Sequence, residues 1–125
     1  MKIAIILASG PGERVAPWSN FCNKTLFKVD GKPLLLHHIE ALAKLNYHIY
    51  ITVHHLASQI QQSIPYKYGN QVECIMEKDL IGSGGACSTI MKDNNVKRAM
   101  IIYGDTFFKE YSYLHADRLY RKDKN

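Results

Sequence analysis

A short apolar run that ends directly in a glycine-bearing loop is the feature that most constrains how this chain folds. Residues 2–7 read KIAIIL, a continuous isoleucine-rich stretch, which is typical of a parallel strand buried on both faces. Residues 9–14, SGPGER, follow at once with two glycines and an arginine. A buried strand that opens into such a loop is typical of α/β folds, whose ligands bind at the carboxyl ends of the strands.

The rest of the chain alternates between strand and helix patterns. Further strands are predicted over residues 47–54, 71–76 and 98–103, with a short one within 25–29. Helices are predicted over 33–45, 56–64, from a glycine-rich turn at 82–85 to about 92, and over 112–121. This alternation predicts a Rossmann-like α/β fold, a mainly parallel sheet with helices on both faces, in one domain over residues 1–125.

Composition excludes several classes of protein. With 125 residues and 46% hydrophobic content, the chain is long enough for one domain with a core. Its apolar runs are far shorter than the roughly 20 residues that cross a bilayer, and the first is too short for a signal peptide, so we expect a cytoplasmic protein without a membrane partner. The net charge of +5 comes partly from a tail at 118–124, expected to be solvated, without a basic stripe interleaved with aromatics. It therefore favours a small anionic ligand over nucleic acid.

Cysteine and histidine spacing argues against zinc or disulfides. Cys22, Cys74 and Cys87 are the three cysteines and form no C-x-x-C, so we expect free thiols, with Cys74 and Cys87 as small core residues. The histidine pairs at 37–38 and 54–55 have no evident third ligand. We interpret them as incidental, with one imidazole of the first pair partly buried.

Three segments follow predicted strands and should meet at a single edge of the sheet: the loop at residues 9–14, the residues after Met76, and the Gly104-Asp105 pair. Arg14 lies in the glycine loop, Lys24 follows ten residues later, and Asp105 follows Gly104 at the end of the last predicted strand. Backbone N–H groups, Arg and Lys suit a triphosphate, and Asp suits the Mg²⁺ that accompanies it. Taken separately, each residue also fits a plainer interpretation as a turn, a surface charge or a cap. The loop is neither the dinucleotide fingerprint nor a Walker A loop, because it lacks a third glycine and a G-K-[ST].

Four segments resemble, in order, the sugar-1-phosphate nucleotidyltransferases. They read LASGPGERVAP, NKTLFKVDGKPLLLHHIEAL, EKDLIGSGGA and IIYGDTFF. The corresponding family patterns are LAAG-x-G-[ST]-R-L-x-P, P-K-x-L-x-x-V-x-G-[KR]-P-[LM], L-G-T-[AG]-G-A and G-D. The motifs are nearest to those of hexose- and heptose-1-phosphate guanylyltransferases. Family catalytic domains are considerably longer, so the resemblance implies a truncated fold that holds only the amino-terminal, nucleotide-binding half.

The resemblance implies a role for individual positions. Arg14 pairs with the β- and γ-phosphates, Lys24 contacts the α-phosphate, and Asp105 binds Mg²⁺. A sugar-1-phosphate oxygen attacks the α-phosphorus in line and expels pyrophosphate, which requires positioning and charge neutralisation. The implied nucleotide-binding positions are Leu7, Ala8, Ser9, Gly10, Gly12, Glu77 and Gly82.

Glu77 lies where family members place the side chain that reads the nucleobase. A carboxylate accepts hydrogen bonds from guanine N1–H and N2–H₂ and repels the carbonyl oxygens of uracil or thymine, so we expect GTP to be favoured.

Two residues depart from the family pattern. Glu13 replaces a small hydroxyl residue, and Asn23 replaces the proline before Lys24, which we expect to loosen the segment that aims the lysine. The family's second Mg²⁺-binding aspartate belongs to the absent half. Asp117 and Asp123 are the candidates near the end, in a predicted helix or tail without matching context.

Three functions stay open. The first is transfer of a nucleoside monophosphate to a sugar 1-phosphate, and the second is a non-catalytic nucleotide-binding remnant or partner subunit. The third is a cytidylyltransferase that acts on an alcohol or amine phosphate. An absent carboxyl half would leave apolar surface exposed, which predicts a homo-oligomer or a partner that covers it.

Overall fold

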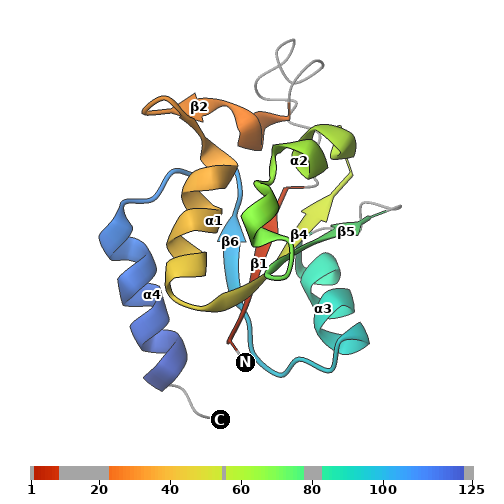
Figure 1. Cartoon of the computed structure of the whole chain (residues 1–125). Coiled ribbons are helices and arrows are strands. Elements are labelled where there is room, and N and C mark those ends of the chain that lie inside the picture. The colour runs from red at the N-terminus through yellow and green to blue at the C-terminus, as the bar shows by residue number, and fades with distance from the viewer. Residues whose placement is uncertain (1, 9–22, 55, 78–82, 123–125) are drawn as a thin grey trace.

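A four-stranded parallel sheet forms the centre of the computed structural model, which describes residues 2–8, 23–54, 56–77 and 83–122 (Figure 1). The strand order is β5-β4-β1-β6, and all neighbouring strands are parallel. Because β4 and β5 extend the sheet on one side of β1 and β6 on the other, the order reverses beside β1. In open α/β sheets this switch point is where ligands bind. The strands are β1 (Lys2–Leu7), β4 (Tyr47–Val53), β5 (Val72–Met76) and β6 (Met100–Tyr103).

Helices cover both faces of the sheet, as the alternating pattern predicts. Side chains of α1, α2 and α4 share one core cluster with Ala4 and Ile6 of β1. Cys87 and Ile90 of α3 share a second cluster with Ile3 and Ile5, which point to the opposite face. The central strand is therefore buried on both sides, which explains its continuous apolar sequence. The helices are α1 (Leu34–Lys44), α2 (Ala57–Ser63), α3 (Ser83–Asp93) and α4 (Glu110–Lys122), with short 3₁₀ turns η3 (Lys24–Leu26) and η4 (Tyr66–Tyr68).

The segment before α1 differs from the prediction. Instead of one strand within 25–29, η3 is followed by a small antiparallel hairpin of β2 (Lys28–Val29) and β3 (Lys32–Pro33). Its turn residues Asp30 and Gly31 both have positive φ, at 53° and 76°, the conformation that Asp-Gly favours in two-residue hairpins. The helix begins after Pro33, whose ψ of 137° is extended.

Other element boundaries move by a few residues. β6 begins at Met100 rather than 98, and α3 begins at Ser83, so its first turn includes part of the predicted glycine turn. The basic residues at 118–122 lie in α4 rather than in a tail; they are exposed to solvent as expected, and Arg121 also binds Asp117.

Two of the three cysteines and the four α-helices lie within the described residues. Cys87 is buried, Cys74 is half-buried, and both are free; Cys22 lies outside the described residues. Among the helices described, none combines the length and the apolar character needed to cross a membrane.

Candidate functional site at the carboxyl edge of the sheet

The ends of β1 and β6 are held together at Gly104. Its N–H donates to the Leu7 carbonyl at 3.0 Å. A Cβ atom at this position would lie 2.7 Å from the Leu7 oxygen and 3.0 Å from Cγ2 of Thr25, closer than such atoms approach. The absence of a side chain therefore lets the chain turn directly off the sheet and brings Asp105 beside the end of β1.

Lys24 and Asp105, both expected to serve one triphosphate–metal site, are in direct contact. The Nζ atom of Lys24 lies 3.0 Å from Oδ2 of Asp105, and the side chains are 26% and 44% exposed. Burial alone would raise the pKa of Asp105, but the hydrogen bond and charge of Lys24 outweigh it and lower that pKa. The carboxylate is therefore ionised at neutral pH, beside a single cation among the residues described.

Asn23 fixes the backbone that leads into Lys24. The residue is 1% exposed, and its Nδ2 donates to the Ala8 carbonyl at 3.3 Å. Its Oδ1 accepts hydrogen bonds from the backbone N–H of Thr25 at 2.9 Å and from the Thr25 hydroxyl at 2.7 Å. The expectation that Asn23 loosens this segment was wrong, because a capping amide replaces the stiffness of proline with hydrogen bonds to the end of β1.

The backbone of Ala8 continues the sheet beyond β1. Its N–H lies 3.1 Å from the hydroxyl and 3.2 Å from the carbonyl of Thr52, and its carbonyl accepts from Asn23. Leu7 and Ala8 thus reach the same edge as Lys24, with their polar backbone groups engaged in the sheet and its cap.

Glu77 lies at the same edge, directly after β5. Its N–H donates to the Val53 carbonyl at 2.8 Å, and its carbonyl lies 2.5 Å from Nδ1 of His54. The side chain is half-buried, and Oε2 is a buried oxygen without a hydrogen-bond partner in the described part of the chain. A buried carboxylate oxygen without a donor is unfavourable, so a bound donor would stabilise it.

Residues 3–125 match the family model described as nucleotidyl transferase. The chain belongs to the nucleotidyl transferase family. It is 35% identical over 105 residues to the bifunctional sugar-1-phosphate nucleotidylyltransferase/acetyltransferase of Sulfurisphaera tokodaii, which covers 84% of this chain and 25% of the relative. It is 30% identical over 113 residues to the bifunctional protein GlmU of a Sulfurovum species, over 90% of this chain and 25% of the relative.

Solved nucleotidyl transferase structures share the fold. HddC from Yersinia pseudotuberculosis, complexed with GMP-PN, is 26% identical with a TM-score of 0.72, over 95% of this chain and 55% of that one. The CTP:phosphocholine cytidylyltransferase LicC from Streptococcus pneumoniae is 27% identical with a TM-score of 0.68, over 86% and 47%. This chain therefore spans about half of these structures and a quarter of the curated relatives. The resemblance and the fold class predicted from the sequence are confirmed.

Five predicted positions of this nucleotidyl transferase lie outside the described residues and stay predictions. They are Ser9, Gly10, Gly12, Arg14 and Gly82.

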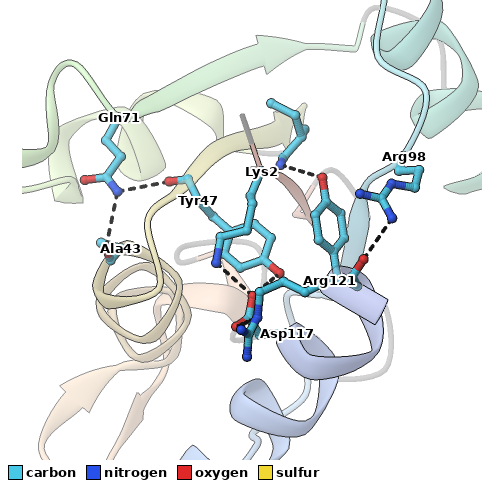
Figure 2. Close-up of polar contacts among 9 residues, drawn as sticks. Lys2, Ala43, Tyr47, Gln71, Arg98, Asp117 and Arg121 are labelled. Carbon is cyan, nitrogen blue, oxygen red and sulfur yellow. Dashed lines mark hydrogen bonds and ion pairs between the residues drawn. The ribbon is translucent and has the colours of Figure 1, made fainter. Parts of the chain in front are cut away.

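Asp117 lies at the opposite edge of the sheet and is no candidate for a second metal ligand. It is 4% exposed, and its Oδ1 accepts from Lys2 Nζ at 2.9 Å and from the Tyr47 hydroxyl at 2.7 Å. Arg121 Nε donates to Oδ2 at 3.0 Å, and Figure 2 shows these side chains converging on the carboxylate. Lys2 and Tyr47 begin β1 and β4, so this cluster ties α4 to the amino ends of the strands. Asp123 lies outside the described residues.

Asp105 suits Mg²⁺ as one of several ligands. Within residues 2–8, 23–54, 56–77 and 83–122, no three His, Cys, Asp or Glu side chains gather closely enough to hold a metal by themselves. Asp105 is exposed, and besides Lys24 its side chain contacts its own backbone N–H and, at 3.4 Å, the Thr106 hydroxyl. Mg²⁺ bound with a nucleotide commonly takes one or two carboxylates and completes its shell with phosphate and water, which fits this arrangement.

His38 is a buried residue near the site whose contacts with Gly104 and Tyr113 were not predicted. It is 0% exposed, with Nε2 lying 3.2 Å from the Gly104 carbonyl and Nδ1 2.7 Å from the Tyr113 hydroxyl. Burial lowers its pKa to about 4. Its burial agrees with the expectation of a buried imidazole in the 37–38 pair, since His38 lies four residues from both Leu34 and Leu42 on the buried stripe of α1.

Proposed function

We propose that this chain provides the nucleotide-binding half of an enzyme that transfers a nucleoside monophosphate from a triphosphate to a sugar 1-phosphate, releasing pyrophosphate. The observation that carries the proposal is the Lys24–Asp105 contact at the switch point beside β1. Membership of the nucleotidyl transferase family supports the class of reaction, and the relative from Sulfurisphaera tokodaii supports a sugar 1-phosphate as acceptor.

The residues at this edge account for the charges that such a transfer develops. Lys24 would turn its ammonium group from Asp105 toward the α-phosphate oxygens and stabilise their negative charge during in-line attack. Asp105 would hold Mg²⁺, which neutralises phosphate charge when bound. Arg14 would pair with the β- and γ-phosphates. The acceptor oxygen forms a bond to the α-phosphorus as the bond from phosphorus to the bridging oxygen breaks, and pyrophosphate leaves with that electron pair.

GTP is the proposed nucleotide because of Glu77. Its buried Oε2 has no donor among the described residues, and guanine offers two adjacent N–H donors to a carboxylate. The similarity to HddC, which was solved with GMP-PN, supports the same base. A competition between GTP, CTP, UTP and dTTP for the protein tests this choice; preferential binding of UTP or CTP would contradict it.

A cytidylyltransferase that acts on an alcohol or amine phosphate is the second candidate. It is favoured by the similarity to LicC, at 27% identity over 86% of this chain. An assay of pyrophosphate release separates the two candidate functions. A cytidylyltransferase would turn over CTP with phosphocholine, whereas the sugar-phosphate enzyme would turn over GTP with a sugar 1-phosphate. Binding of a nucleotide without turnover of either pair would instead identify a binding remnant or partner subunit.

The open edge of the sheet is the proposed contact with a second copy or another polypeptide. β6 is one of the two edge strands of the described sheet, and Ile101 and Tyr103 are 46% and 59% exposed on the face that α3 covers elsewhere. Exposed apolar side chains on a strand that pairs on one side only favour association. We expect light scattering to show self-association as concentration rises; a monomer across the whole series would exclude a homo-oligomer.

The decisive experiment is a thermal-shift titration with GTP, with and without Mg²⁺. A ligand that binds the folded state raises the melting temperature, and we expect D105N to lose the part of the shift that needs Mg²⁺. D93N, at the exposed end of α3, is the matched control and should behave like the wild type. A full Mg²⁺-dependent shift in D105N would refute the proposed role of Asp105.

A further inference from the structure

His38 joins two helices to the turn that carries Asp105. The imidazole comes from α1, packs against Phe108 with ring centroids 5.9 Å apart, and hydrogen-bonds Tyr113 of α4. Its other nitrogen faces the carbonyl oxygen of Gly104. The ring is thus held between α1 and α4 on the face of the sheet that these helices cover, and it reaches the backbone one residue before Asp105.

The two contacts determine which nitrogen carries the proton. A carbonyl oxygen only accepts hydrogen bonds, so Nε2 of His38 bears hydrogen and donates to Gly104. In a neutral imidazole Nδ1 is then an acceptor, and the Tyr113 hydroxyl donates to it. Two directional hydrogen bonds, one at each end of a fully buried ring, fix the ring and the carbonyl that it binds.

The carbonyl matters because it belongs to the peptide unit that leads into Asp105. A peptide unit is planar, so fixing the Gly104 oxygen also fixes the nitrogen and Cα of Asp105. The N–H of Gly104 is already bound to the Leu7 carbonyl at 3.0 Å. Gly104 is therefore held on one side by the sheet and on the other by His38, whereas the Asp105 side chain is 44% exposed and has no such packing of its own.

We propose that His38 is a positioning residue, which acts through the Gly104 carbonyl to hold the Asp105 carboxylate at the place where it meets Lys24 and a metal–nucleotide complex. The part of this inference that concerns metal rests on the proposed function. An apolar side chain at position 38 would fill the same space but would leave the carbonyl without its donor. The histidine is therefore expected to contribute more than packing.

Two substitutions separate its hydrogen bonds. In His38→Gln the amide nitrogen lies near the position of Nε2 and keeps a donor for Gly104. In His38→Asn the shorter amide reaches the position of Nδ1 and keeps only the partner of Tyr113. His37→Asn is the matched control, since the neighbouring His37 makes a similar bond to a carbonyl, that of Val29 at 2.6 Å, and not to that of Gly104.

The ligand-dependent readout is the Mg²⁺ concentration that half-saturates the thermal shift with GTP. We expect H38N to raise it roughly fivefold, the effect of one hydrogen bond, with H38Q and H37N near the wild type. If H38N does not fold, as judged by circular dichroism, H38L removes both bonds with an apolar side chain and replaces it in the series.

A second readout needs no ligand. Carbon NMR of the Asp105 carboxyl should show a pKa below the ordinary range in the wild type, H38Q and H37N, and a higher pKa in H38N, because the contact with Lys24 is loosened. If wild-type protein shows no Mg²⁺-dependent binding but the carboxyl still responds in this order, the proposed function fails and the positioning role stands. If folded H38N or H38L matches the wild type in both readouts, the positioning role is overturned.

Discussion

Two lysine–aspartate pairs lie at opposite edges of the same sheet, and their distances do not distinguish them. Lys24 lies 3.0 Å from Asp105 at the carboxyl ends of the strands, and Lys2 lies 2.9 Å from Asp117 at the amino ends. Their surroundings differ, because the Asp117 side chain is 5% exposed and receives hydrogen bonds from a lysine, a tyrosine and an arginine. Asp105 is 44% exposed, with one close partner in the described chain.

The difference separates a carboxylate that stabilises the fold from one that is available to a ligand. Burial alone would raise the pKa of Asp117, but the hydrogen bonds from Lys2 and Tyr47 and the nearby positive charges lower it. A buried carboxylate whose oxygens all accept hydrogen bonds holds the elements around it together. Removal of that carboxylate leaves its partners without a counter-charge. An exposed pair contributes little stability, so the Lys24–Asp105 pair can exchange partners at little cost to the fold.

Removal of the buried Asp117 carboxylate should give the largest loss of stability. We expect Asp117→Ala to lower the free energy of unfolding by about 3 kcal/mol, because it leaves the buried Tyr47 hydroxyl and the charge of Lys2 without their acceptor. Urea denaturation measures the loss. Asp93→Ala, at an exposed position on α3, is the matched control and should change stability by less than about 0.5 kcal/mol. Equal effects of the two variants would remove the distinction drawn for Asp117.

His38, the buried histidine near the Lys24–Asp105 pair, should make the stability of the protein depend on pH. Because the pKa of His38 is about 4 in the folded protein and about 6.5 when unfolded, the unfolded chain binds a proton first as pH falls. The contribution of His38 to stability is fully present above the pKa of the unfolded state and is lost as the pH falls toward the pKa of the folded state. The expected loss is about 2 kcal/mol between pH 8 and pH 5. Urea denaturation across this range should show the decline, with a smaller slope in H38Q; an equal slope in both proteins would exclude His38 as its source.

Removal of the Asn23 side chain, beside the Lys24–Asp105 pair, should have an intermediate effect on stability. Asn23→Ala removes the cap of η3 and the bond to Ala8, which we expect to lower stability by about 1 to 2 kcal/mol. The measurement is again urea denaturation. Gln61→Ala, on an exposed position of α2, provides the comparison, and an Asn23 variant as stable as this one would show that its hydrogen bonds contribute little.

Loss of the exposed Asp105 carboxylate should have the smallest effect on stability. We expect Asp105→Asn to change the free energy of unfolding by less than about 0.5 kcal/mol, as for other exposed ion pairs, while the Mg²⁺-dependent thermal shift with GTP disappears. The opposite outcome, a destabilised protein that retains this shift, would assign Asp105 to the fold rather than to the ligand.

Much of this arrangement could be predicted from the sequence because it depends on local pattern. The isoleucine-rich run predicted β1, and the parallel alternation implied that the residues after Met76 and Asp105 would share one edge, whereas Lys24 was assigned to the site through the family resemblance. The Asp30-Gly31 hairpin was missed although Asp-Gly is a strong turn signal, since β2 and β3 are only two residues each.

The sequence did not identify the partners of polar residues when those partners lie far away in the chain. Asn23 is satisfied by the end of β1, His38 by Gly104 and Tyr113, and Asp117 by the first residues of two strands. Spacing alone does not identify such partners, because they become neighbours only when the sheet assembles. The family pattern did not predict the role of Asn23, because the family has a proline at this position and the asparagine fixes the backbone by hydrogen bonds instead.

Gly104 has a consequence for the thermodynamics of binding. Since no methyl group fits between it and Leu7, the backbone beside Asp105 is ordered when the sheet folds rather than when a ligand arrives. Conformational entropy that is already lost on folding is not lost again on association. An exposed carboxylate on so constrained a backbone therefore has fewer degrees of freedom to give up than one on a free loop, and it would bind a cation with a smaller entropic penalty.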